Sequence, residues 1–180
     1  MLTITVPPTE IWDERTERML KFKGQTIQME HSLISLSKWE QKYCKVFLGN
    51  KDITEEELRY YFKCMTITPN VDDLCYLSLT SANISEIINY IDAPMSATFI
   101  KDSPNQKKSR EPVTSELIYY WMIEGTVPVE FEKWHLNRLL TLIKVIGLKR
   151  TPPKKRSKNE ILASNRALNE ARKAQWNTKG

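Results

Sequence analysis

The sequence predicts a mainly α-helical fold with a small N-terminal β-hairpin element and a basic C-terminal helical tail. Three observations favour this class: apolar residues recur at three- and four-residue spacing over most of the chain, strand-like alternation is confined to about residues 1–30, and basic residues gather at the end. A chain of 180 residues, 41% of them hydrophobic, suits one folded domain with an appendage. We therefore expect a body over residues 1–150 and a basic linker with an amphipathic tail helix over residues 151–180.

The β element begins with the stretch LTITV, residues 2–6, in which β-branched residues alternate. Pro7 and Pro8 follow, and because neither has an amide hydrogen to donate, the strand is expected to end there. Apolar and polar residues alternate again around Gly24. Residues 19–29 are therefore expected to form a second strand or a hairpin beside the first.

From Ser32 onward the apolar residues follow the period of a helix. Thr54 and Glu57 have the spacing of a capping box, which predicts the start of the next helix. The helices that follow residue 70 are expected over residues 71–77, 81–91, 115–125 and 131–148. Large apolar residues occupy nearly all sides of the last two of these helices. We therefore expect both to be buried and the helix over residues 131–148 to be the central core helix.

The sequence contains no pattern typical of catalysis, of a metal site or of a cofactor site. The five glycines are dispersed, which excludes glycine-rich phosphate loops, and the three cysteines, Cys44, Cys64 and Cys75, lack the paired spacing of a zinc site. We expect these thiols to be buried in a reducing cytoplasm. His31 and His135 are the only histidines, and we expect both to be hydrogen-bonded structural residues. No enzyme activity and no membrane-spanning segment are expected.

The basic run PPKKRSK, residues 152–158, has three interpretations: a solvated linker, a nuclear localisation signal, or a phosphate contact. The helix after it alternates cations with Asn, Glu and Ala, and Trp176 is its only aromatic residue. A single-strand binder needs a continuous basic track with several stacking rings, so nucleic acid is not the favoured partner. The residues available for phosphate contact are Lys154, Lys155, Arg156 and Lys158.

Six phrases spread over nearly the whole chain resemble one family in combination. They are MEHSLISLSKWE (29–40), CMTIT (64–68), INYIDAPMSATF (88–99), ELIYYWMI (116–123), KWHLNRLLTLI (133–143) and LNEARKAQWNTKG (168–180). Together they resemble the tail assembly chaperones of long-tailed bacteriophages. The resemblance implies a protein of the host cell cytoplasm, absent from the mature virion, that binds the helical tape measure protein, keeps it soluble during tail morphogenesis and helps to recruit the tail tube protein.

Two other classes of protein stay open: a nucleic-acid-binding accessory protein that uses the basic tail, and a minor structural tail protein. Homo-oligomerisation stays open as well.

The C-terminal tail is strongly basic. Residues 149–180 hold ten Lys or Arg and two Glu, which gives a net charge of +8; because the total is +5, the other residues carry −3. Ser157 and Glu160 predict the start of the tail helix, which we expect to contact a protein partner unless it packs back on its own body. The expected contacts are Ile161, Leu162, Leu168 and Trp176, with Arg166, Arg172 and Lys173 as charged residues.

Overall fold

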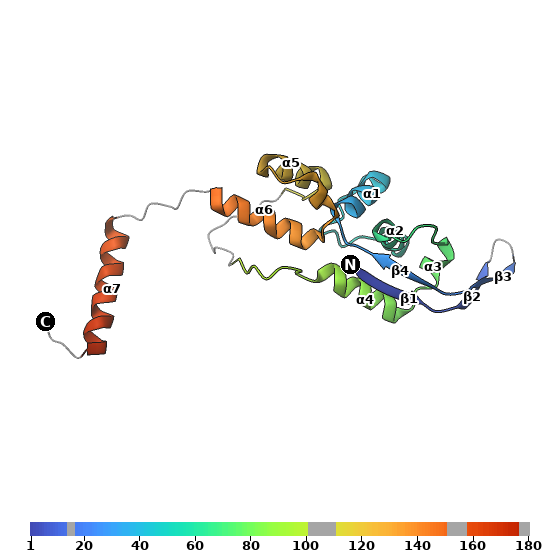
Figure 1. Cartoon of the computed structure of the whole chain (residues 1–180), viewed down its shortest axis with the longest axis horizontal. Coiled ribbons are helices and arrows are strands. Elements are labelled where there is room, and N and C mark those ends of the chain that lie inside the picture. Colours follow the sequence, from blue (N-terminus) through green and yellow to red (C-terminus); the bar gives the residue numbers. More distant parts are fainter. Residues whose placement is uncertain (14–16, 101–110, 151–157, 177–180) are drawn as a thin grey trace. The chain divides into compact units, whose positions relative to one another are not determined.

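The computed structural model describes residues 1–13, 17–100, 111–150 and 158–176 (Figure 1). The chain divides into two compact units, Met1–Gly147 and Leu148–Gly180. Seven α-helices and four short strands lie in the described ranges. The expected mainly α fold with a small antiparallel β element at the N-terminus is therefore confirmed.

The N-terminal strands form one hairpin in two paired sections. β1 (Leu2–Val6) pairs antiparallel with β4 (Gln25–Met29), and β2 (Thr9–Asp13) pairs antiparallel with β3 (Arg18–Phe22). The strand expected over residues 2–6 is confirmed. The second strand expected beside the first is confirmed in β4, but it does not continue over all of residues 19–29, because the ladder is interrupted between β3 and β4. β2 lies where no strand is expected from the sequence.

Gly24 and the proline pair account for this interruption. Gly24 has a φ of +79°, and a Cβ placed on it would lie 2.9 Å from the nitrogen of Pro8 and 3.0 Å from the carbonyl oxygen of Val6. Pro7 and Pro8 have no amide hydrogen to offer to the opposite strand. The segments around Pro8 and Gly24 therefore lie close together without the hydrogen bonds of a β-ladder. Only glycine fits this geometry.

The helices begin at the caps that the sequence indicates. Ser32 caps α1 (Leu33–Tyr43) and Thr54 caps α2 (Glu55–Met65), and both starts are capping boxes. These two predicted starts are confirmed. The later helices are α3 (Asp73–Leu77), α4 (Ser81–Asp92), α5 (Ser115–Gly125), the short 3-10 helix η1 (Val129–Lys133), α6 (Leu136–Arg150) and α7 (Lys158–Trp176).

The larger of two hydrophobic clusters lies on one face of the β1–β4 sheet. Buried and exposed residues alternate along both strands, so one face of the sheet is covered and the other is open. Helices α1, α2 and α4 supply the cover, and α4 lies along β1 (Figure 1). The buried side chains at the centre of this cluster are Ile4, Ile27, Met29, Trp39, Tyr61, Phe62 and Ile87.

A second cluster forms where α1, α5 and α6 meet. Because α1 contributes Trp39 to the first cluster and Leu36 to the second, it is the central helix of the body. The expectation that α6 is the central core helix is wrong, since only Leu136 and Leu139 of that helix are buried. The buried members of the second cluster are Leu33, Leu36, Ile118, Met122, Val127, Leu136 and Leu139.

Helix α5 is also less buried than its sequence predicts. Ile118 and Met122 are buried on the side that contributes to the second cluster. On another side Ile123 is 77% exposed and Tyr120 is 56% exposed. The apolar residues of α5 thus occupy more of its circumference than the neighbouring helices cover, which is why the expectation of full burial is wrong.

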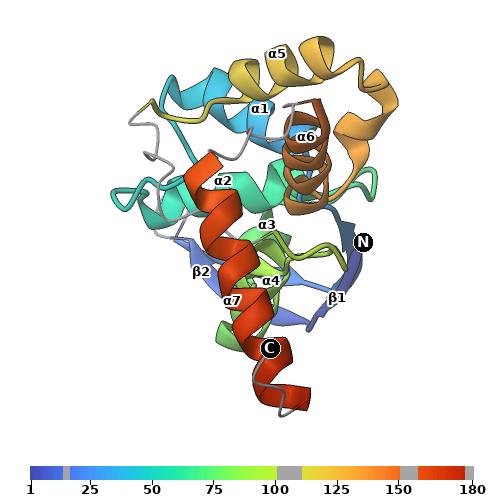
Figure 2. The same cartoon turned by 90° about the vertical axis from the view of Figure 1, so that its left-hand side faces the viewer.

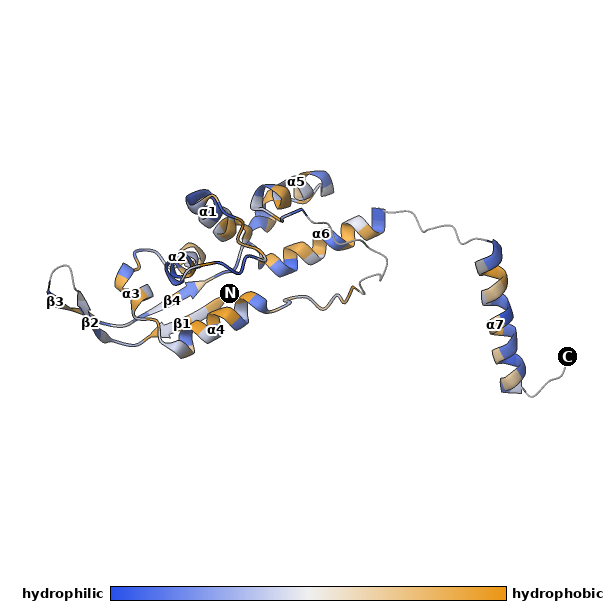
Figure 3. Cartoon of the chain, turned by 180° about the vertical axis from the view of Figure 1, so that it is seen from behind, coloured by the Kyte–Doolittle hydropathy of each residue, from blue (hydrophilic) through white to orange (hydrophobic). Residues whose placement is uncertain are grey.

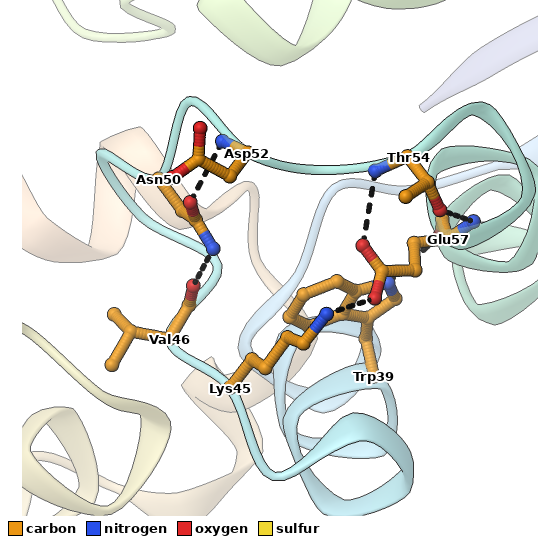
Figure 4. A network of polar contacts seen from close by, with 7 residues as sticks. All are labelled: Trp39, Lys45, Val46, Asn50, Asp52, Thr54 and Glu57. Carbon is orange, nitrogen blue, oxygen red and sulfur yellow. Dashed lines mark hydrogen bonds and ion pairs between the residues drawn. The ribbon is translucent and has the colours of Figure 1, made fainter.

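Hydrogen bonds around Glu57 fix how the loop between α1 and α2 leads into α2 (Figure 4). The indole N–H of Trp39 donates to the Glu57 carbonyl at 2.8 Å. The Glu57 carboxylate accepts from Lys45 Nζ at 2.5 Å and from the Thr54 amide at 3.0 Å. The bond from Lys45, followed by the one from Thr54, lowers the pKa of the Glu57 carboxyl.

Asn50 holds the turn within the same loop (Figure 4). Its side-chain amide donates to the Val46 carbonyl at 3.1 Å, and its side-chain oxygen accepts from the Asp52 amide at 2.9 Å. The preceding residue, Gly49, supplies a φ of +78°. The connection between α1 and α2 is therefore a defined turn.

Candidate partner-binding surface

The residues expected to contact a partner lie on α7, a helix of 19 residues. Its apolar side chains are exposed, from 45% for Ile161 to 71% for Trp176. Ile161, Leu168 and Trp176 recur about every two turns, so they share one side of the helix, and Leu162 lies at the edge of that side. We call these four residues the tail stripe.

Charged residues border the tail stripe. Helical periodicity places Arg172 on the same side, between Leu168 and Trp176, and places Arg166 and Lys173 next to Leu162. Figure 3 shows the hydrophobic patches of α7 between strongly hydrophilic turns. A stripe of this kind can pair with an apolar helical face that carries carboxylates.

The four cations considered for phosphate contact are only partly described. Lys158 is the first residue of α7, and its side chain is exposed. Lys154, Lys155 and Arg156 lie outside the described residues.

The two histidines meet in the interior of the body, a juxtaposition that the sequence does not predict. The rings of His31 and His135 lie 5.1 Å apart between centroids, and both side chains are buried. Nδ1 of His31 lies 2.6 Å from the Tyr61 hydroxyl, and Nε2 of His135 lies 2.9 Å from the Tyr90 carbonyl. Both histidines are therefore hydrogen-bonded, as expected.

The hydrogen bonds of His135 define its protonation. Nδ1 accepts the amide hydrogen of Asn137 at 3.3 Å, so the proton of the neutral ring lies on Nε2, which donates to the Tyr90 carbonyl. Burial lowers the pKa of His135, and burial together with the neighbouring His135 lowers the pKa of His31 to about 3. Both rings are therefore neutral near pH 7.

The three thiols expected to be buried have different environments. Cys75 is buried, Cys64 is half-buried and Cys44 is exposed. The expectation is wrong for Cys44, because this residue ends α1 in the left-handed conformation, with a φ of 50°, and faces solvent. Burial raises the pKa of the Cys64 and Cys75 thiols.

Two kinds of feature are absent from the described part of the chain. No group of three or more His, Cys, Asp or Glu side chains there is placed to hold a metal ion. None of the helices there combines the length and the apolar composition that crossing a membrane requires. Comparisons of the chain with models of protein families, with curated proteins and with solved structures each find no match.

Proposed function

We propose that this protein is a non-enzymatic tail assembly chaperone, which binds the tape measure protein in the host cytoplasm and keeps it soluble while a long phage tail is assembled. The resemblance of the six sequence phrases supports the proposal. The observation that carries it is the exposed tail stripe of α7. A stripe of large apolar side chains bordered by cations is typical of a surface that another helix covers.

The free energy available from the tail stripe indicates how α7 would bind its client. A tape measure protein is a long helix with apolar faces that aggregate when they are exposed. Each large side chain of the tail stripe that becomes buried contributes at most about 1.5–3 kcal/mol, and ordering α7 and its partner consumes part of that gain. The contact is therefore reversible, as a chaperone that must release its client requires.

The test is co-expression with the long helical protein that the proposal expects to be encoded immediately downstream, followed by affinity capture at low and high salt. The variant Ile161→Glu/Leu168→Glu places two carboxylates on the tail stripe. Its matched control, Ala163→Glu/Ala167→Glu, places the same charges on the opposite side of α7. We expect the wild type and the control to hold the client in a soluble complex that survives high salt, and the stripe variant to leave it insoluble.

Other outcomes would point to other functions. If the long protein stays insoluble while this chain elutes alone, the chaperone proposal fails. A salt-sensitive mobility shift with DNA would then favour the nucleic-acid-binding alternative through the basic tail. Recovery of this chain in purified virions would favour a minor structural tail protein.

A further inference from the structure

The chain that leaves α2 forms a third, strand-like segment beside β4. The Glu30 amide donates to the Met65 carbonyl at 2.9 Å, and the Ile67 amide donates to the Gln28 carbonyl at 2.8 Å. These two hydrogen bonds lie on either side of an antiparallel bridge between Met29 and Thr66. We call residues 66–68 the edge segment, because they extend the β1–β4 pair by one position.

The outer side of the edge segment offers main-chain groups for another strand. Because Ile67 bonds toward β4, the main-chain groups of its neighbours Thr66 and Thr68 point the other way. The Thr66 amide is bonded to the Lys63 carbonyl at 3.2 Å. The Thr66 carbonyl and the Thr68 amide have no main-chain partner among the described residues. Main-chain groups that lack a partner at the edge of a sheet are a template for strand addition.

An open groove of about 350 Å³ adjoins the edge segment. Ile34 of α1 and Ile67 contribute apolar surface to its lining, and Ile67 is 54% exposed. Two lysines line it as well, Lys38 from α1 and Lys133 from η1. The groove thus combines apolar side chains, two ammonium groups and an adjacent main-chain edge.

The one carboxylate of the groove, Glu30, is already engaged. Its Oε1 accepts from the Tyr90 hydroxyl at 2.7 Å, and its Oε2 lies 3.0 Å from the amino group of Met1. Among the described residues, neither Lys38 nor Lys133 has a carboxylate within ion-pair distance. The groove is therefore left with the positive charge of these two lysines.

We propose that this groove binds an extended acidic segment of a partner protein, which adds a strand to the edge segment. The main chain of the ligand bonds to the Thr66 carbonyl and the Thr68 amide. Its carboxylates pair with Lys38 and Lys133, and its apolar side chains cover Ile67. Because side chains alternate along a strand, the acidic and apolar side chains that enter the groove come from every second residue of the ligand. This site belongs to the body and is independent of α7.

The binding test uses the full chain and a fluorescent, capped peptide in which every second position is alternately glutamate or valine, so that both kinds of side chain share one face. We expect saturable binding by fluorescence anisotropy and none with the lysine–valine counterpart. Lys38→Glu/Lys133→Glu should weaken binding at least about tenfold, the effect of losing two charge-assisted contacts. Lys144→Glu, which makes the same change at an exposed position of α6, should leave the affinity unchanged. Equal affinities for wild type and the double variant would overturn the proposal.

Two further measurements test the mode of binding. N-methylation of the peptide amides removes main-chain donors, so an N-methylated peptide of unchanged affinity would refute strand addition. Cys64 lines the groove, and in a Cys44→Ser background the bound peptide should slow alkylation of Cys64 by a maleimide.

Oligothymidine tests the alternative ligand. If it displaces the peptide, and if it also slows the reaction of Cys64 with the maleimide when no peptide is present, the groove binds nucleic acid instead. A loss of client binding by the tail-stripe variant has no bearing on these results.

Discussion

The hydroxyl of Tyr61 lies 2.6 Å from Nδ1 of His31, and both side chains are buried. Tyr61 belongs to the cluster under the β1–β4 sheet, and it stacks on Phe47 with ring centroids 3.9 Å apart. The main chain of His31 accepts the amide hydrogen of Leu136, a member of the second cluster, at 2.7 Å. A short polar contact thus joins two apolar clusters, and burial, which lowers the pKa of His31, keeps its ring neutral near pH 7.

Replacing Tyr61 with Phe should remove the hydrogen bond to His31 and keep the ring stack with Phe47. A buried ring nitrogen then lacks its partner, which costs about 1–3 kcal/mol in free energy of unfolding. Urea denaturation of the full chain measures this change. The matched control is Tyr120→Phe, at a position that is 56% exposed, where we expect no loss. Equal stabilities for the two variants would contradict the structural role of the contact.

The buried histidines should make the body less stable as the solution becomes acidic. The pKa of His31 is about 3 in the folded chain and about 6.5 in the unfolded chain, so between these values only the unfolded chain binds the proton. The contribution of His31 to the free energy of unfolding should then fall by at most about 1.4 kcal/mol for each pH unit below about 6.5. Between about pH 6.5 and 5.5 most carboxyl groups stay ionised, so the slope there reports mainly the histidines.

Denaturation curves at several pH values test this dependence. His31→Gln keeps a hydrogen-bonding side chain but does not titrate, so its slope between about pH 6.5 and 5.5 should be shallower than that of the wild type. His135 remains in this variant, and burial also lowers its pKa, so part of the slope persists. If the variant and the wild type lose stability in parallel, His31 is not the cause.

Gly24→Ala should destabilise the hairpin more than Gly49→Ala. Both glycines have a positive φ, +79° and +78°, which costs an alanine roughly 1 kcal/mol at either position. Only at Gly24 does the added Cβ also meet main-chain atoms, whereas nothing lies within 4 Å of a Cβ at Gly49. Comparing thermal unfolding of the two variants isolates the steric part. A smaller effect at Gly24 would show that the hairpin shifts without cost.

Glu57→Gln should weaken the junction between α1 and α2 most at neutral pH. The bonds from Lys45 and Thr54 lower the pKa of the Glu57 carboxyl, so the ionised group stabilises the fold above its unfolded pKa and loses this effect as the pH falls through its folded pKa. The difference between variant and wild type should therefore shrink at acidic pH. Glu56→Gln, at the neighbouring exposed residue, serves as the control. A difference that is constant with pH would exclude a role for the charge.

The features that could be predicted from sequence are those with local causes. Ser32 and Thr54 begin helices because their side chains bond to amides three residues away, and the tail stripe follows from helical periodicity alone. The central place of α1 could not be predicted, because α6 looks more apolar and only packing decides how much of each helix is covered. The groove could not be predicted either, because its lysines come from α1 and η1, which lie far apart in sequence.

The two faces of α1 have a consequence for synthesis of the chain. The buried residues of the first cluster end at Tyr90, whereas the second cluster needs Ile118 to Leu139 to cover Leu33 and Leu36. A protein is made from its N-terminus, so a nascent chain can pack the first cluster while these two leucines still face the solvent around the ribosome. Translation that stops before α5 therefore releases a product in which the apolar side of α1 is exposed, which makes it a substrate for quality-control proteolysis. Both clusters are complete only after α6 has been synthesised.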